Sequence, residues 1–294
     1  MSTTEANQDP TTWFDGRARV MFVHAHPDDE TITTGGTLAA LAEAGREPLL
    51  VTLTRGEQGE VVAGPLEALV AAHGLAVARQ NELKTALGML GVERHAFLGV
   101  EPARAEGAPP VIYEDSGMVW GPDGRATAAP EAGPDALTSA PAVEALNDLL
   151  AAAYRSGAQA IVSYDDGGGY GHPDHVFAHR ISRAVAQALD LPFWEIAVDA
   201  YESGDHASES TIGAHERAGA VDRGAADPAP ESDEPGDALD AHDVTPWLPR
   251  KLAALRGYAT QLTLDGEEIV HVGGQREPVR AVEMFRRVTP PAAA

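Results

Sequence analysis

The chain has 294 residues, a formal net charge of −24 and no cysteine. Its length allows one large domain or two smaller ones. Because cysteine is absent, disulfides, thiolate metal sites and cysteine nucleophiles are excluded, and any metal must be held by nitrogen and oxygen atoms. The acidic balance argues against nucleic-acid binding, which needs a basic surface.

The chain opens without a basic segment followed by an apolar one, and contains no run of eighteen apolar residues. We therefore expect a soluble, cytoplasmic protein with no membrane partner. Residues 1–16 are polar and are predicted to form a flexible tail. The apolar run 19–25 predicts a buried strand.

The first strand leads into a helix and a second strand. Gly45 suits the left-handed residue that ends a helix, and the apolar run 48–54 follows it. A strand, helix and strand of these lengths predict a parallel pair with a right-handed crossover. Residues 66–90 are expected to be mostly helical and residues 95–98 to form a short strand. Residues 101–136, rich in Gly and Pro, are expected to form an extended active-site loop without packed elements.

The second half repeats the alternation of helix and strand. A helix is expected at 142–155, a strand at 159–164 with a helix after it to about Leu189, and a strand at 193–198. A helix is expected again at 247–262, with one or two strands from Glu267. The pattern predicts an α/β fold: a Rossmann-like, mostly parallel sheet with helices on both faces.

Residues 201–245 differ in composition from the rest of the chain. They hold twelve Asp or Glu against two Arg, with few apolar side chains. Such composition is typical of disorder, so we expect an acidic, disordered insertion. The prediction is a single domain at 17–294 that this insertion interrupts.

Two clusters of histidine and aspartate follow predicted strands. Residues 25–30 (AHPDDE) follow the first strand, and residues 170–175 (YGHPDH) lie beyond the strand at 159–164. Ligands of open α/β sheets bind beyond the carboxyl ends of the strands. The two clusters could therefore meet at one site, which we interpret as a mononuclear metal centre.

The spacing of these residues suits a catalytic metal. Catalytic zinc takes three protein ligands and leaves a position for water. His26 and Asp29 can supply two ligands from one turn and His175 the third. Asp28 is then free to act as a general base, and His172 can protonate a leaving group.

Each cluster also has a simpler explanation. Asp28, Asp29 and Glu30 could cap the following helix, and His172 could belong to a solvated turn. Tyr170 could donate a hydrogen bond to an oxyanion or merely lie at the rim. The coincidence of two clusters at two strand ends favours the metal site. Two imidazoles and a carboxylate accept Fe²⁺ as well as Zn²⁺.

At these residues the chain resembles the LmbE-like (PIG-L) zinc deacetylases. The resemblance lies in residues 25–30 and 172–175 and covers about 19–264, apart from the insertion. Further stretches are similar to the deacetylases of mycothiol biosynthesis: 56–61 (GEQGEV), 115–118 (DSGM), 168–171 (GGYG) and 252–256 (LAALR). The resemblance implies an LmbE-like fold and a cytoplasmic hydrolase that removes acetate from an N-acetylglucosaminyl-inositol.

The resemblance also implies roles for individual residues. It implies zinc ligation by His26, Asp29 and His175, with Asp28 as the general base. His172 would be the general acid or an electrostatic stabiliser, and Tyr170 would assist the oxyanion. The positions that match contacts to the sugar and inositol hydroxyls are Arg79, Asp115 and Glu60. Asp174 matches the carboxylate that orients a metal-binding histidine.

Two other interpretations remain open. An amidase of mycothiol conjugates, or a deacetylase of another N-acetyl amino sugar, would keep the same metal site. A non-enzymatic binding module on a Rossmann-like scaffold would need neither a metal nor Asp28.

Overall fold

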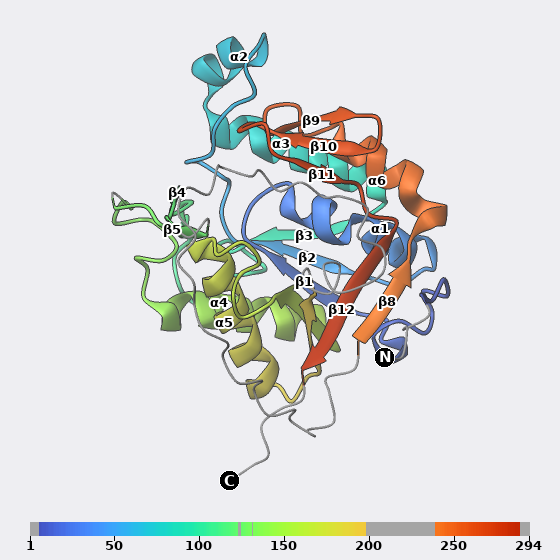
Figure 1. Ribbon diagram of the computed structural model, residues 1–294. Helices are drawn as coiled ribbons and strands as arrows, with labels where there is room; N and C mark the ends of the chain where they lie inside the picture. The colour runs from blue at the N-terminus through green and yellow to red at the C-terminus, as the bar shows by residue number, and fades with distance from the viewer. Residues whose placement is uncertain (1–5, 123–124, 131, 198–238, 289–294) are drawn as a thin grey trace, which may run out of the picture.

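The computed structural model describes residues 6–122, 125–130, 132–197 and 239–288. Its centre is a seven-stranded sheet with the order β3-β2-β1-β6-β7-β12-β8 (Figure 1). The bounds of these strands in chain order are β1 Val20–His24, β2 Leu49–Thr52, β3 Arg94–Phe97, β6 Ala160–Tyr164, β7 Phe193–Ile196, β8 Leu239–Asp243 and β12 Val282–Val288. The strands from β3 to β7 are parallel, and β12 runs antiparallel to both neighbours. The predicted mostly parallel α/β sheet is confirmed.

Helices cover both faces of the sheet. One face carries α1 (Asp29–Glu43), α3 (Leu75–Leu90) and α6 (Leu248–Leu255), and the other carries α4 (Ala142–Ser156) and α5 (Pro173–Ala188) (Figure 1). The side chains of β1 contact the helices on both faces, because successive side chains of a strand point to opposite faces of the sheet. Phe22 packs in the core beneath α1 and α3, whereas Met21 and Val23 pack in the core beneath α4 and α5. The sequence of a strand that is buried on both faces is therefore a nearly continuous run of apolar residues.

The order of the strands fixes where a ligand site can form. From β1 the chain winds outward through β2 to β3, and later continues on the other side of β1 through β6 and β7. The winding therefore reverses between β1 and β6, and such a reversal opens a crevice at the carboxyl ends of the two strands. The two histidine and aspartate clusters leave these same two strands.

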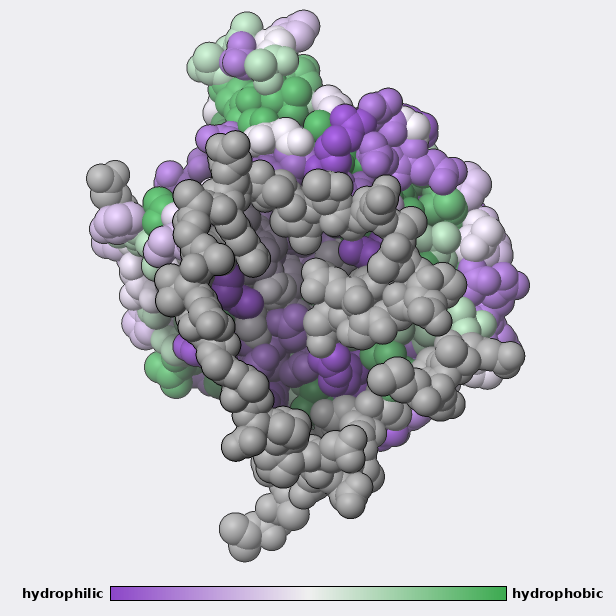
Figure 2. Space-filling view, viewed as in Figure 1, coloured by the Kyte–Doolittle hydropathy of each residue, from purple (hydrophilic) through white to green (hydrophobic). Residues whose placement is uncertain are grey.

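Smaller elements surround the core. They are η1 (Phe14–Gly16), α2 (Leu66–His73), the hairpin of β4 (Met118–Trp120) and β5 (Ala126–Ala128), η3 (Thr245–Trp247), and the three-stranded sheet of β9 (Leu262–Asp265), β10 (Glu268–His271) and β11 (Arg276–Pro278). Helix α2 projects from the body and carries a hydrophobic surface (Figures 1 and 2). No helix of the described ranges is long and apolar enough to span a membrane.

Residues 66–90 are mostly helical, as predicted, and form two helices. Gly74 separates α2 from α3 at φ 88°, a conformation that glycine adopts without strain. The prediction that 101–136 lacks packed elements is wrong, since it contains β4 and β5. Within it, Arg104 and Tyr113 are buried and both donate hydrogen bonds to Asp148 of α4, at 2.7 and 2.8 Å.

The predicted tail is attached to the fold from Asn7 onward, and its Trp13 and Phe14 belong to the core. Trp13 and Phe14 are buried, and the Phe14 ring meets the Phe22 ring edge-on at 5.8 Å. Asn7 forms a bridge with His242 of β8. Two aromatic side chains suffice to anchor this otherwise polar segment, because each buries a large apolar area. Residues 1–5 lie outside the described ranges.

The carboxyl-terminal boundaries also need correction. Residues 201–238 of the predicted insertion lie outside the described ranges, but 239–243 form β8 and Thr245 begins η3. Strand β8 exists because it pairs with β12 and Trp194 donates to Asp240 at 2.8 Å. The helix predicted at 247–262 ends at Leu255, and four strands follow where one or two were expected.

Candidate metal and catalytic centre

The three predicted ligands converge beyond β1 and β6. Asp29 Oδ2 lies 3.2 Å from His26 Nδ1 and 3.3 Å from His175 Nε2, and the two ring nitrogens are 3.4 Å apart. Tetrahedral coordination with bonds of about 2.0–2.1 Å places neighbouring ligand atoms about 3.3 Å apart. The donor atoms therefore fit a tetrahedral metal ion on three corners.

A carboxylate orients the ring of His26. Its Nε2 lies 3.2 Å from Asp174 Oδ2 and 3.5 Å from Asp115 Oδ1. Asp174 Oδ2 also accepts the backbone N–H of Ser116 at 2.9 Å. Carboxylate oxygens only accept hydrogen bonds, so Nε2 carries a proton directed at Asp174, and a metal ion bound at Nδ1 would take the place of the proton directed at Asp29. Asp174 thus contacts a candidate ligand as a metal-bound imidazole requires.

Two further combinations of residues could hold a metal. The first is His26, His172 and His175, and the second is His26, Asp115 and Asp174. Within each combination the possible ligand atoms lie within 4.8 Å of one another. These carboxylates lie on the Nε2 side of His26, where hydrogen bonds already occupy them. We favour the Nδ1 side, where all three donors have the tetrahedral spacing.

Tyr164 holds two of the candidate ligands and was missed in the sequence. Its hydroxyl donates to Asp29 Oδ2 at 2.7 Å and accepts the Ala25 N–H at 2.8 Å. Its ring stacks on His175 at 4.0 Å between centroids. Its position at the end of β6, shortly before the second cluster, could have identified it from the sequence as a residue near the site.

Asp28 has the conformation and surroundings of a functional carboxyl group. Its φ of 120° is unfavourable for a residue with a side chain, and such strain concentrates at active sites. In the described structure its side chain makes no capping bond to α1, which argues against the simple helix-cap interpretation. Burial, aided by the negative charge of Asp29, raises the pKa of Asp28 to about 8.

The turn that carries Asp28 is supported from inside the protein. Glu30 is fully buried and accepts hydrogen bonds from the hydroxyls of Thr31 and Tyr258. Its other oxygen accepts the backbone N–H of Asp28 at 3.1 Å. Glu30 therefore fixes the backbone next to Asp28, and neither its role nor that of Tyr258 was evident from the sequence.

His172 is a neutral hydrogen-bond donor. It precedes α5, and its Nδ1 accepts the backbone N–H of Asp174 at 3.2 Å, so its proton resides on Nε2. Burial and the neighbouring imidazoles of His26 and His175 lower the pKa of His172 to about 3. Its ring centroid lies 4.5 Å from that of His26, which places it against the candidate metal ligands.

Tyr170 lies at the rim of the centre. Its ring centroid is 5.2 Å from that of His175, and 46% of the residue is exposed. Its pKa is raised by desolvation and by the Asp29 carboxylate, so the hydroxyl remains protonated and able to donate. The geometry fits both a rim aromatic and a donor at the site edge.

The structure brings two of the three predicted sugar contacts to the centre. Arg79 is buried against Gly56 and Gly59, where a Cβ atom would lie 2.2 and 2.1 Å from its guanidinium nitrogens. Its positive charge opposes part of the rise that burial and Asp29 cause in the pKa of Asp28. Asp115 lies beside His26, as described above. The Glu60 side chain is exposed, and its carbonyl oxygen accepts from Arg79 at 3.3 Å.

Comparison with solved structures supports the fold. A deacetylase of the antimicrobial A40926 pseudoaglycone matches with a TM-score of 0.56 and 18% identity, covering 95% of this chain and all of that one. The N,N′-diacetylchitobiose deacetylase of Pyrococcus horikoshii matches with a TM-score of 0.50 and 18% identity, covering 85% and 72%. The fold is therefore the LmbE-like one that the sequence predicted.

Comparison of sequences identifies the family. A curated relative from Kineococcus radiotolerans is 38% identical over 92% of this chain and 77% of its own, and one from Kribbella flavida is 34% identical over 94% and 93%. Both are named 1D-myo-inositol 2-acetamido-2-deoxy-alpha-D-glucopyranoside deacetylase. Residues 21–186 match the model of the PIG-L family, described as GlcNAc-PI de-N-acetylase. The chain belongs to the PIG-L family.

Proposed function

We propose that this protein is a zinc-dependent N-deacetylase of mycothiol biosynthesis. It hydrolyses the acetamide of 1D-myo-inositol 2-acetamido-2-deoxy-glucopyranoside to acetate and the free amine. The observation that carries the proposal is the tetrahedral spacing of His26 Nδ1, Asp29 Oδ2 and His175 Nε2 beside the buried Asp28. The substrate is proposed from the names of the curated relatives.

The donor set suits the proposed metal. Two imidazole nitrogens and one carboxylate oxygen are ligands that Zn²⁺ accepts, and Fe²⁺ accepts them as well. A bound zinc ion would acidify water and polarise the amide carbonyl. Asp174 and Tyr164 would keep His26, His175 and Asp29 in place for it.

Asp28 takes the proton of the attacking water. Its pKa of about 8 reflects burial and the nearby Asp29 carboxylate, and a dication in the centre would lower it toward neutrality. A general base works best when its pKa lies near the working pH. The fixed backbone of Asp28, bonded to Glu30, keeps the carboxyl group from turning away.

His172 and Tyr170 act on the other side of the reacting carbon. The Nε2–H of neutral His172 donates a hydrogen bond to the oxygen on which negative charge develops, and the proton that Asp28 has taken from water passes to the leaving amine. The hydroxyl of Tyr170 is a second donor at the rim. Arg79 and Asp115 orient the sugar, since a guanidinium donates to hydroxyl oxygens and a carboxylate accepts from hydroxyl groups.

The decisive experiment measures free amine by fluorescamine after incubation of the purified protein with the N-acetylglucosaminyl-inositol. We expect amine release that a chelator abolishes and Zn²⁺ restores, with one metal ion per chain. No release from a protein that contains one metal per chain would favour the conjugate amidase or another N-acetyl sugar. No release and no bound metal would favour a binding module.

A further inference from the structure

A cavity lies outside the catalytic centre. Its volume is about 700 Å³, within the range of small-molecule sites, and it lies between the end of β3, the first half of α3 and residues 100–112. None of the proposed metal ligands, nor Asp28, His172 or Tyr170, lines it. Glu57 is the residue that connects the two places, because its Oε2 accepts the backbone N–H of Asp115 at 3.0 Å.

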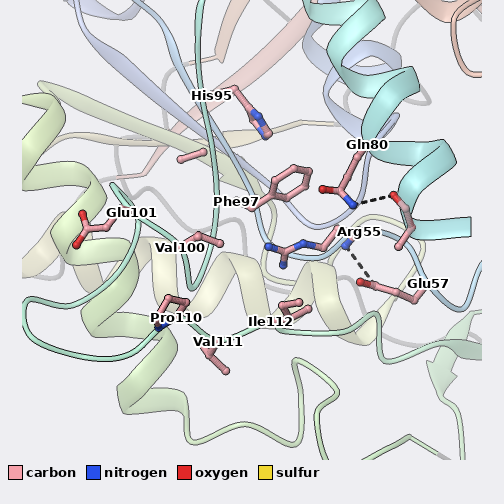
Figure 3. A pocket seen from close by; sticks show the side chains of 12 residues that line it. Arg55, Glu57, Gln80, His95, Phe97, Val100, Glu101, Pro110, Val111 and Ile112 are labelled. Carbon is pink, nitrogen blue, oxygen red and sulfur yellow. Dashed lines mark hydrogen bonds between the residues drawn. The ribbon is translucent and has the colours of Figure 1, made fainter. Parts of the chain in front are cut away.

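Arg55 is a buried cation in this cavity. It follows β2, only 6% of it is exposed, and its guanidinium carbon lies 4.6 Å from the centroid of the Phe97 ring. Figure 3 shows the guanidinium below that ring, directed toward the wall that Val100 forms. Its Nη1 is buried and has no hydrogen-bond acceptor among the residues that the structure describes.

Such a guanidinium needs a negative partner. Burying a cation is unfavourable unless an anion or hydrogen-bond acceptors compensate, and Arg is suited to binding a planar carboxylate through two parallel hydrogen bonds. The Glu57 carboxylate accepts the backbone N–H of Arg55 at 3.2 Å and the N–H of Asp115, and Figure 3 shows it below the guanidinium and turned toward the backbone. The side of the guanidinium that faces the cavity remains available.

The walls determine the kind of anion. Phe97, Val100, Val111 and Ile112 make the cavity largely apolar, and Gln80 adds one amide (Figure 3). Glu57 and Glu101 at its edges repel multiply charged ligands, and among the lining residues that the structure describes Arg55 is the one cation. We propose that this cavity binds a small monocarboxylate with an apolar or aromatic body, its carboxylate on Arg55 and its body against Phe97 and Val111.

The test uses benzoate as the probe and benzamide as its neutral counterpart. Binding to the metal-loaded protein is measured by titration calorimetry for the wild type, for Arg55→Gln and for the charge-matched control Arg180→Gln on the surface of α5. We expect Arg55→Gln to weaken benzoate binding about tenfold or more, the usual size of a charge-assisted hydrogen bond, and Arg180→Gln to leave it unchanged. Benzamide should bind the wild type as weakly as benzoate binds Arg55→Gln.

A second measurement needs no variant. In methyl-labelled wild-type protein, benzoate should shift the methyl resonances of Val100, Val111 and Ile112, and benzamide at the same concentration should not. The proposal is overturned if benzoate shows no saturable binding, if Arg55→Gln folds and binds it equally well, or if only resonances around the metal ligands move. The last result would assign benzoate to the catalytic centre.

Discussion

The hydroxyl of Tyr164 donates to the carboxylate of Asp29 across 2.7 Å, although the two residues are separated by 135 positions. The same tyrosine lies flat against the His175 ring, so one side chain restrains a carboxylate and an imidazole that the proposed metal site uses. Outer contacts of this kind set how well the ligands are oriented before a metal arrives.

Replacing Tyr164 with Phe should therefore weaken metal binding while keeping the stacked ring. We expect zinc affinity to fall about 10- to 100-fold, the usual effect of losing a hydrogen bond to a ligand. Competition with a chromophoric chelator measures it. Tyr154→Phe, at a residue that is 78% exposed, is the matched control and should bind zinc as the wild type does. Equal affinities for both variants would contradict the assigned role.

Asp28→Asn should separate catalysis from metal binding. The variant keeps the size of the side chain but cannot take a proton, so we expect kcat to fall about 10²- to 10⁴-fold with zinc still bound. His175→Ala should instead lose the metal. Amine release and zinc content measured on the same samples distinguish the two effects. An Asp28→Asn enzyme with full activity would show that another group accepts the proton.

Gly59→Ala should act through Arg79. A Cβ at this position would lie 2.1 Å from Nη2 of Arg79, so the guanidinium must move. Misplacing a substrate-orienting group can lower kcat/KM up to about 100-fold, and we expect such a loss without a change in zinc content. Gly88→Ala in α3, where a Cβ meets nothing within 4 Å, is the control and should retain activity. A normal kcat/KM for Gly59→Ala would mean that Arg79 does not orient the substrate.

The raised pKa of Glu195 should make the free energy of unfolding depend on pH. It lies on β7, and burial, aided by the charge of Asp166, raises its pKa from 4.5 to about 7. The folded protein then holds this proton more tightly than the unfolded chain, so its contribution to stability is greatest below pH 4.5 and is lost as pH rises to about 7.

Glu195→Gln should remove this loss. We expect the variant to gain up to about 3 kcal/mol in the free energy of unfolding at pH 8 relative to pH 5, compared with the wild type. Urea unfolding at the two pH values measures the difference. Glu106→Gln, at an exposed glutamate, should unfold in parallel with the wild type at both. If Glu195→Gln did the same, the Glu195 carboxyl group would have an ordinary pKa in the folded protein.

Local sequence was enough to predict the elements that build the sheet. The apolar runs that became β1 and β6 are buried on both faces, and a strand in that position needs no polar alternation. The clusters around His26 and His175 follow the same strands, so their meeting could be predicted from topology.

Other features depend on tertiary contacts that local sequence does not reveal. Strand β8 lies in an acidic stretch and is specified by its pairing with β12. Phe14 sits in a polar segment but packs on Phe22 and Trp194. Glu30 looked like a helix-capping residue, and only the position of Tyr258 on a distant segment reveals it as a buried support.

His26 and His175 are 149 residues apart along the chain, yet they leave strands that are already hydrogen-bonded to each other. The sheet, and not the ion, therefore brings the ligands together. A small zinc finger loses its fold with its metal, whereas here a chelated chain should keep its cooperative melt and regain activity when zinc returns. Loading with metal can then follow folding, and activity can depend on the zinc supply while the amount of folded protein stays constant.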